Sequence, residues 1–224
     1  MNMLVIACET LKEELLHIAE KNNIDINFTW VNSGLHEIPE NLCNQLQEEI
    51  NKYDGHYENL LLAYGSCGGG TIGLKTEMSK LIIPVADDCL SLVLGGNCRR
   101  NKIAEDDCAF FMTKGWVRCR REMKNTSLQY LREKYGDELA EEIFKDMYVN
   151  YRSIDIIDTD AYDLNEIKNE INEFKTIINL SEKVVKGDLS IIVNFLTKVW
   201  DKGFIIKSPG DLIKKSDFDN LQNI

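Results

Sequence analysis

Two short and almost wholly apolar runs, residues 59–64 and 81–85, constrain the fold of this chain most. Each has the length of a strand, and neither alternates apolar with polar residues as a strand with one face in water does. Continuous apolar runs are typical of strands that helices cover on both faces, as in a parallel sheet. The sequence therefore predicts an α/β fold with these two strands inside its sheet.

The rest of the chain alternates predicted strands and helices, which is the order of elements in an α/β protein. We expect a mainly parallel sheet with helices on both faces, in a single α/β domain over residues 1–224. Two α/β lobes, 1–120 and 150–224, joined by a long helix over 127–147, fit the same pattern. The other predicted strands are 4–8, 24–31, 109–117, 153–158, 176–180 and 204–207, and the other predicted helices are 11–21, 39–51, 164–175 and 189–200.

The formal net charge of −11 limits the classes of partner. Nucleic acids and anionic membranes are bound through clustered Lys and Arg, so we expect neither as a partner. No run approaches the roughly 18 apolar residues of a membrane span, and the first residues do not resemble a signal peptide. We therefore expect a cytoplasmic protein whose seven cysteines are reduced thiols.

Three of the cysteines come shortly after predicted strands or end them. Cys8 ends the first apolar run, Cys67 follows residues 59–64, and Cys89 follows residues 81–85. In an open parallel sheet the carboxyl ends of the strands line the crevice in which ligands bind. We expect the three thiols to converge there, where they would suit a metal ion or an iron–sulfur cluster. Burial in the core is the alternative for each cysteine taken singly, because free Cys is among the most buried residue types.

A glycine-rich segment, residues 64–73, surrounds Cys67. Glycine lets a ligand approach the backbone closely, and successive N–H groups in such a turn can bind an anion. One interpretation is a phosphate loop, since Gly68, Gly70 and Gly73 fit the weak Gly-x-Gly-x-x-Gly pattern. We favour a loop whose N–H groups donate to the sulfurs of a metal or cluster site, and a tight turn without a ligand is the structural alternative. The residues expected to contact the cofactor are Gly65, Ser66, Gly68 and Gly69.

Three titratable side chains near these strand ends are candidates for proton transfer, namely Glu9, His36 and Asp88. His36 lies in a loop before a predicted helix and could also be a fourth ligand. Asp87 or Asp88 would cap the helix that follows, which would place Cys89 in a first turn where the helix dipole favours the thiolate. Capping alone for the carboxylates, and a surface position for His36, are the structural alternatives.

Short segments spread along the chain carry a resemblance to a known family: 7–9, 34–36, 39–40, 64–68, Pro84 with 88–89, 94–95, 113–116, 187–188 and Phe204 with 209–210. Over nearly its whole length the chain resembles an uncharacterised family, domain-of-unknown-function family 1638. The family pattern carries Cys8, Cys67 and Cys89 at matching places. Gly96-Asn97-Cys98 departs from its usual Ser-Arg-Glu, so a role for Cys98 would be particular to this chain. Members often occur in anaerobes with corrinoid-dependent methyl transfer, which implies a corrinoid-pathway protein as a partner.

Four hypotheses follow for the function. The leading one is a 4Fe-4S iron–sulfur cluster held by three cysteines, with an open iron that acts on a small-molecule substrate, which resembles dehydratases, quinolinate synthase and desulfidases. The second is a three-thiolate zinc site for methyl or alkyl transfer linked to corrinoid metabolism. The third is a carrier of metal, cluster or corrinoid without catalysis, and the fourth is a metal-free enzyme with Cys67 or Cys89 as nucleophile. A homodimer is compatible with all four.

Overall fold

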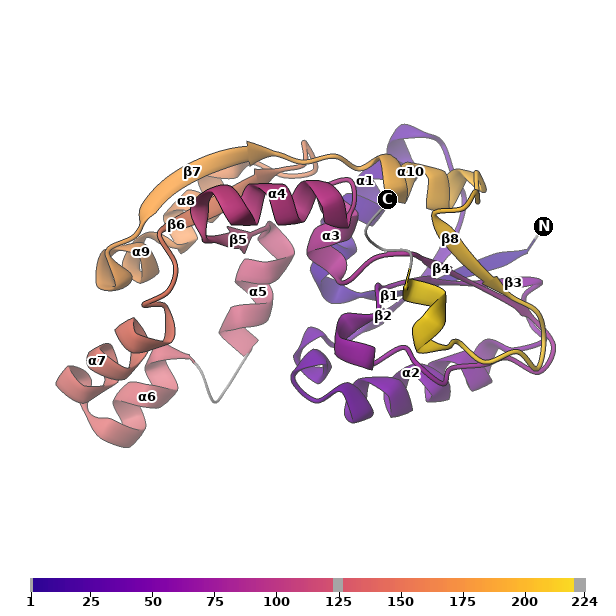
Figure 1. The fold of residues 1–224 in the computed structure, drawn as a ribbon, viewed down its shortest axis with the longest axis horizontal. Helices are drawn as coiled ribbons and strands as arrows, with labels where there is room; N and C mark the ends of the chain where they lie inside the picture. Colours follow the sequence, from indigo (N-terminus) through magenta and orange to yellow (C-terminus); the bar gives the residue numbers. More distant parts are fainter. Residues whose placement is uncertain (1, 123–126, 220–224) are drawn as a thin grey trace. The chain divides into compact units, whose positions relative to one another are not determined.

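The computed structural model describes residues 2–122 and 127–219 and has the α/β fold that the sequence predicts (Figure 1). A five-stranded sheet has the order β2-β1-β3-β4-β8, and a three-stranded sheet has the order β5-β6-β7. Every neighbouring pair of strands is parallel except β4 and β8, which are antiparallel. None of the helices in the described residues is long and apolar enough to cross a membrane.

The five-stranded sheet consists of β1 (Met3–Cys8), β2 (Asn27–Val31), β3 (Asn59–Ala63), β4 (Lys80–Pro84) and β8 (Phe204–Lys207). Every residue of β1 and β3 is buried. This burial on both faces explains why the two strands are apolar without alternation. Each fully buried Leu or Ile in them stabilises the fold by about 1.5–3 kcal/mol relative to an exposed position.

Helices cover both faces of this sheet (Figure 1). On one face α2 (Pro39–Tyr53) packs Leu42, Leu46 and Ile50 into a cluster with alternate strand residues such as Ile6. On the other face lie α1 and α10, which contact each other. The bounds of these two helices are α1 (Lys12–Lys21) and α10 (Ser190–Thr197).

A short helix follows each of the four parallel strands of the first sheet. After β1, β2, β3 and β4 come, in turn, η1 (Glu9–Leu11), η2 (Ser33–Glu37), η3 (Cys67–Gly69) and α3 (Cys89–Val93). Because parallel strands end at the same edge, the first residues of these helices lie along one edge of the sheet. The last described helix of the chain is η4 (Lys215–Phe218), which follows β8.

The three-stranded sheet has its own hydrophobic core. Leu131, Phe144, Ile154 and Phe174 are buried together in it with Met112. Its strands are β5 (Ala109–Met112), β6 (Ser153–Asp158) and β7 (Ser181–Lys186), and the accompanying helices are α5 (Lys114–Glu122), α6 (Leu128–Tyr135), α7 (Asp137–Met147), α8 (Leu164–Glu170) and α9 (Asn172–Ile178).

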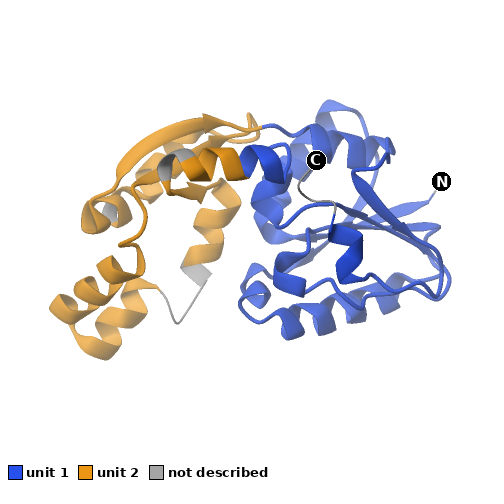
Figure 2. Ribbon diagram, viewed as in Figure 1, with its two compact units in different colours: residues 1–100, 188–224 blue, residues 101–187 orange. Residues whose placement is uncertain are grey.

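The chain forms two compact units, residues 1–100 with 188–224 and residues 101–187 (Figure 2). It passes from the first unit to the second within α4 (Asn97–Asp107). These units differ from the lobes 1–120 and 150–224, because the last part of the chain returns to the first sheet. There β8 pairs with β4, from Leu81 opposite Lys207 to Pro84 opposite Phe204.

Several predicted elements differ from the structure. The predicted helix 164–175 is divided at Ile171 between α8 and α9. The predicted helix 127–147 is broken at Gly136, whose φ of 79° ends α6 before α7 begins. The predicted strand 109–117 stops at Met112, because Thr113 accepts a hydrogen bond from the Trp116 N–H and starts α5. The predicted strand 176–180 is the end of α9 and a left-handed residue, and the strand itself begins at residue 181.

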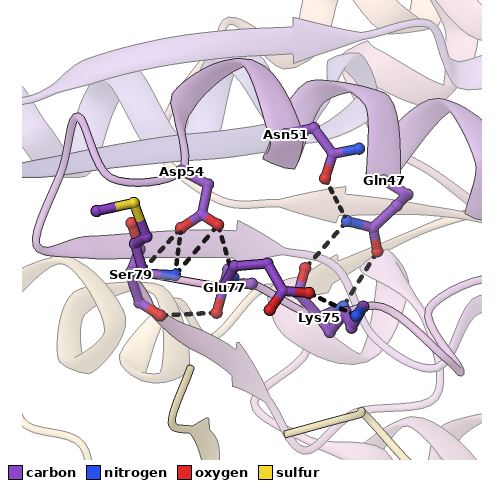
Figure 3. Close-up of polar contacts among 8 residues, drawn as sticks. Gln47, Asn51, Asp54, Lys75, Glu77 and Ser79 are labelled. Carbon is purple, nitrogen blue, oxygen red and sulfur yellow. Dashed lines mark hydrogen bonds and ion pairs between the residues drawn. The ribbon is translucent and has the colours of Figure 1, made fainter. Parts of the chain in front are cut away.

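The start of β4 is fixed by side chains at the carboxyl end of α2, as Figure 3 shows. Asp54 accepts hydrogen bonds from the backbone N–H groups of Glu77 at 2.6 Å and Ser79 at 2.7 Å. Two turns earlier, the Gln47 amide donates to the Lys75 carbonyl at 3.0 Å and accepts from its N–H at 3.1 Å. These contacts hold residues 75–79 in place and so set where β4 enters the sheet beside β3.

Replacing Asp54 by Ala should lower the free energy of unfolding by about 2 kcal/mol, because a charged acceptor of backbone N–H groups is lost. Burial alone would raise the pKa of Asp54, but the N–H donors of Glu77, Ser79 and Met78 outweigh it and hold this pKa below its usual value. The contribution is therefore complete above pH of about 4 and is lost as the pH falls through the lowered value. Urea unfolding at pH 7 and pH 3 measures both effects, with the exposed Asp25→Ala as the matched control. Equal losses at the two pH values would contradict the role of the charge.

Candidate three-cysteine site

Cys8, Cys67 and Cys89 lie at the carboxyl edge of three neighbouring parallel strands. Cys8 is the last residue of β1, Cys67 opens η3 after β3, and Cys89 opens α3 after β4. Burial raises the pKa of Cys89 well above its usual value, and the nearby Asp88, Cys8 and Cys67 raise it further. Burial likewise raises the pKa of Cys67 to about 12, with added contributions from Cys8 and Asp88. The three sulfurs are therefore close enough to interact electrostatically, and Cys67 and Cys89 are neutral thiols at neutral pH in the metal-free protein.

The loop that carries Cys67 is bound to the loop that carries Cys89 through the backbone. The Ser66 N–H donates to the Ala86 carbonyl at 2.8 Å, and the Cys67 N–H donates to the Asp87 carbonyl at 2.7 Å. This close approach requires glycine at position 65, because a Cβ there would lie 2.5 Å from the Ala86 oxygen. Gly65 therefore lets the two loops meet.

Three successive residues of this loop have a left-handed backbone. The φ angles are 47° at Cys67, 66° at Gly68 and 95° at Gly69. The two glycines adopt such angles without steric cost, whereas Cys67 is strained by roughly 1–2 kcal/mol. The glycines thus allow the tight turn, and the surrounding contacts hold the cysteine in a conformation that it would not choose alone.

Asp88 caps α3, as the sequence predicts. Its carboxylate accepts from the Ser91 N–H at 2.9 Å and forms an ion pair with Arg100 at 2.9 Å. The expected favouring of the Cys89 thiolate is not found, because burial dominates and because α3 is a helix of only five residues. Cys98 lies in the first turn of α4.

Tyr64 is a member of the site that the sequence did not single out. It is 2% exposed, and its hydroxyl has no hydrogen-bond partner in the described part of the chain. Burial raises the pKa of Tyr64, and Cys8, Cys67, Cys89 and Glu9 all add to the rise, which places the hydroxyl near the three sulfurs. The register of β1 and β3 ends with Ala7 opposite Ala63, and Cys8 and Tyr64 are the next residues of the two segments. This neighbouring position, and not the composition of the strand, is the signal that locates Tyr64.

Thr10 lies between two of the cysteines. Its hydroxyl donates to the Cys8 sulfur at 3.1 Å. Burial raises the pKa of Cys89, whereas the Thr10 hydroxyl lowers it by hydrogen bonding. Thr10 therefore also lies within hydrogen-bonding range of Cys89. Glu9 lies near this group at the start of η1, where it raises the pKa of Tyr64. The edge of the sheet thus gathers three thiols, two hydroxyls and a carboxylate.

His36 lies at the end of β2, one strand further along the same edge. It belongs to η2, and its Nδ1 contacts the Ser33 carbonyl within that turn. The role of His36 as a fourth ligand stays a prediction. Within residues 2–122 and 127–219, no group of three or more His, Cys, Asp or Glu side chains is arranged to hold a metal ion.

A family model described as a protein of unknown function (DUF1638) matches residues 30–196. The chain belongs to this DUF1638 family. The matched range includes His36, Cys67, Asp88 and Cys89, and it begins after Cys8. No curated protein and no solved structure matches the chain. The resemblance noted in the sequence is thereby confirmed, and the function of this DUF1638 protein has to be argued from the site itself.

Replacing Gly65 by Ala should destabilise this DUF1638 protein by about 3 kcal/mol, because the new methyl group meets backbone atoms that cannot move aside. Gly73→Ala is the matched control, since a Cβ at Gly73 meets nothing within 4 Å and adds only the strain of a φ of 92°. Urea unfolding of both variants measures the difference. A Gly65→Ala protein as stable as the control would show that the two loops do not need their close approach.

Proposed function

We propose that this protein is a metalloprotein in which Cys8, Cys67 and Cys89 hold a 4Fe-4S cluster that acts on a small molecule. The observation that carries the proposal is the gathering of three reduced thiols and the unpartnered Tyr64 hydroxyl at the carboxyl edge of the sheet. A buried hydroxyl without a partner costs about 1–3 kcal/mol, which a bound acceptor would remove. Sulfide and thiolate sulfurs are acceptors of that kind.

A cluster and a single zinc ion make different demands on three thiols. A zinc ion needs its sulfur ligands about 2.3 Å from one point. In a cluster each cysteine binds a different iron, so the three sulfurs stand further apart around a larger body. The proposal takes the cluster, and the metal analysis below distinguishes the two.

The residues of this chain would have different roles in binding the cluster. The three cysteines must lose their protons as the metal binds, so loading should be favoured by rising pH. Tyr64 and Thr10 can donate hydrogen bonds to sulfur, and the loop of Gly65, Ser66, Gly68 and Gly69 can supply backbone N–H groups. With one iron open to substrate, the cluster would supply a Lewis acid.

Glu9 is the best placed of the candidate proton donors. It is close enough to Tyr64 to raise the pKa of that hydroxyl. The carboxylate of Asp88, in contrast, caps α3 and pairs with Arg100. We assign proton transfer to Glu9, an orienting role to Asp88, and leave His36 as a further candidate at the same edge. The proposal also includes a cytoplasmic location, a corrinoid-pathway protein as partner and assembly as a homodimer.

Anaerobically purified protein should contain several irons and sulfides per chain and absorb broadly in the visible range. Cys67→Ser should abolish both, because one of three ligands is lost, while Cys108→Ser in the second unit should leave both unchanged. Elemental analysis and an absorption spectrum of the three proteins measure this. Colourless protein with stoichiometric zinc would replace the proposal by the alkyl-transfer alternative, and protein without either metal would leave the carrier and thiol-nucleophile alternatives.

Tyr64→Phe should have opposite effects on the two forms of the protein. Without metal, removing a buried and unpartnered hydroxyl should leave the thermal stability unchanged or raise it. With the cluster bound, loss of a donor to sulfur should lower the reduction potential, because hydrogen bonds to sulfur stabilise the reduced state. Thermal unfolding of the metal-free variant and redox titration of the loaded one test this, and an unchanged potential would remove Tyr64 from the site.

A further inference from the structure

The second compact unit contains a cavity of about 480 Å³, which is within the range of small-molecule pockets. Apolar and polar side chains share its walls, and the polar ones are Arg120, Ser127, Gln129 and Glu170. The apolar lining residues are Met112, Val117, Leu128, Phe144, Ile171 and Phe174, which come from β5, from the helices α5, α6, α7 and α9 and from the turn before α9. Most of them belong to the hydrophobic core of the unit. The cavity is therefore an opening into that core.

Arg120 brings a positive charge to this apolar wall. Its guanidinium carbon lies 3.8 Å from the centre of the Phe174 ring and 5.3 Å from that of Tyr148. One terminal nitrogen of Arg120 donates to the Tyr148 hydroxyl at 3.0 Å. The stacking and this hydrogen bond fix the plane of the guanidinium, which carries five N–H donors in all.

No carboxylate pairs with Arg120 within the described residues, although Glu170 lines the same cavity. Burial among the rings lowers the pKa of Arg120, which means that its charge is poorly solvated where it stands. An arginine in such a place is stabilised by an anion that accepts two of its parallel N–H groups. The remaining donors of Arg120 are thus available to a ligand.

We propose that this cavity binds a small organic monocarboxylate, with its carboxylate on Arg120 and an apolar body against Phe144 and Phe174. A planar carboxylate matches the fork of a guanidinium, and the apolar walls match a hydrocarbon body. The site therefore selects a single charge joined to an apolar group.

Calorimetric titration of the full chain with acetate, benzoate, 3-phenylpropanoate and 4-biphenylacetate tests the proposal. Affinity should rise with the size of the apolar body, and the methyl esters and inorganic phosphate should bind at least tenfold more weakly than the aromatic acids. Arg120→Met should weaken binding of the acids at least tenfold, while the exposed Arg152→Met should not. The proposal is overturned if no acid binds below 10 mM, if acids and esters bind alike, or if Arg120→Met binds like the unaltered protein.

A second measurement needs no variant and covers the case in which Arg120→Met does not fold. Phenylglyoxal modifies arginines, and mass spectrometry reports the rate at each one. A saturating aromatic carboxylate should slow modification of Arg120 at least tenfold and leave Arg152 unaffected. Equal rates at Arg120 with and without the carboxylate would overturn the proposal.

Discussion

Two backbone hydrogen bonds beyond the ends of β3 and β4 determine the geometry of the candidate site. The Ser66 and Cys67 N–H groups reach the carbonyls of Ala86 and Asp87, so the loops after the two strands continue side by side where the sheet itself has ended. Gly65 makes this approach sterically feasible. Without the pairing, Cys67 would be carried by a free loop, and the thiols of β3 and β4 would share only the edge of a sheet.

The charge state of the site follows from the same burial that assembles it. Burial holds the Cys67 and Cys89 thiols neutral, with the pKa of Cys67 at about 12. A neutral thiol is a poor nucleophile, which counts against Cys67 or Cys89 as the reactive group of a metal-free enzyme. A metal reverses this balance, since its charge offsets the cost of burying thiolates, and the site is therefore more consistent with ligation than with direct attack by sulfur.

Much of the fold could be predicted, because the composition of a strand indicates whether its faces are buried. The apolar runs of β3 and β4, and the cysteines after them, were sufficient to place the thiols at one edge. The break at Gly136 could not be predicted from periodicity, since Leu131 before it and Phe144 after it face the same core and maintain the apolar pattern. Tyr64 was missed for a related reason, because an aromatic residue after an apolar strand usually indicates packing. Only its electrostatic interaction with Cys8, Cys67 and Cys89 places it at the site.

Tyr64 and Arg120 illustrate how a ligand can be inferred where composition gives no motif. Tyr64 places a hydroxyl in apolar surroundings without an acceptor in the described part of the chain, and Arg120 places there a guanidinium of which the Tyr148 hydroxyl accepts one N–H. Folding tolerates such groups only at a cost in stability, because desolvation is not repaid within the chain. The two donors differ in what would satisfy them: a neutral hydroxyl beside three thiols suits sulfur, whereas a stacked guanidinium beside a hydrocarbon wall suits a planar anion. The two compact units therefore point to different ligand chemistries. From its cysteines alone, the sequence indicated a single ligand site.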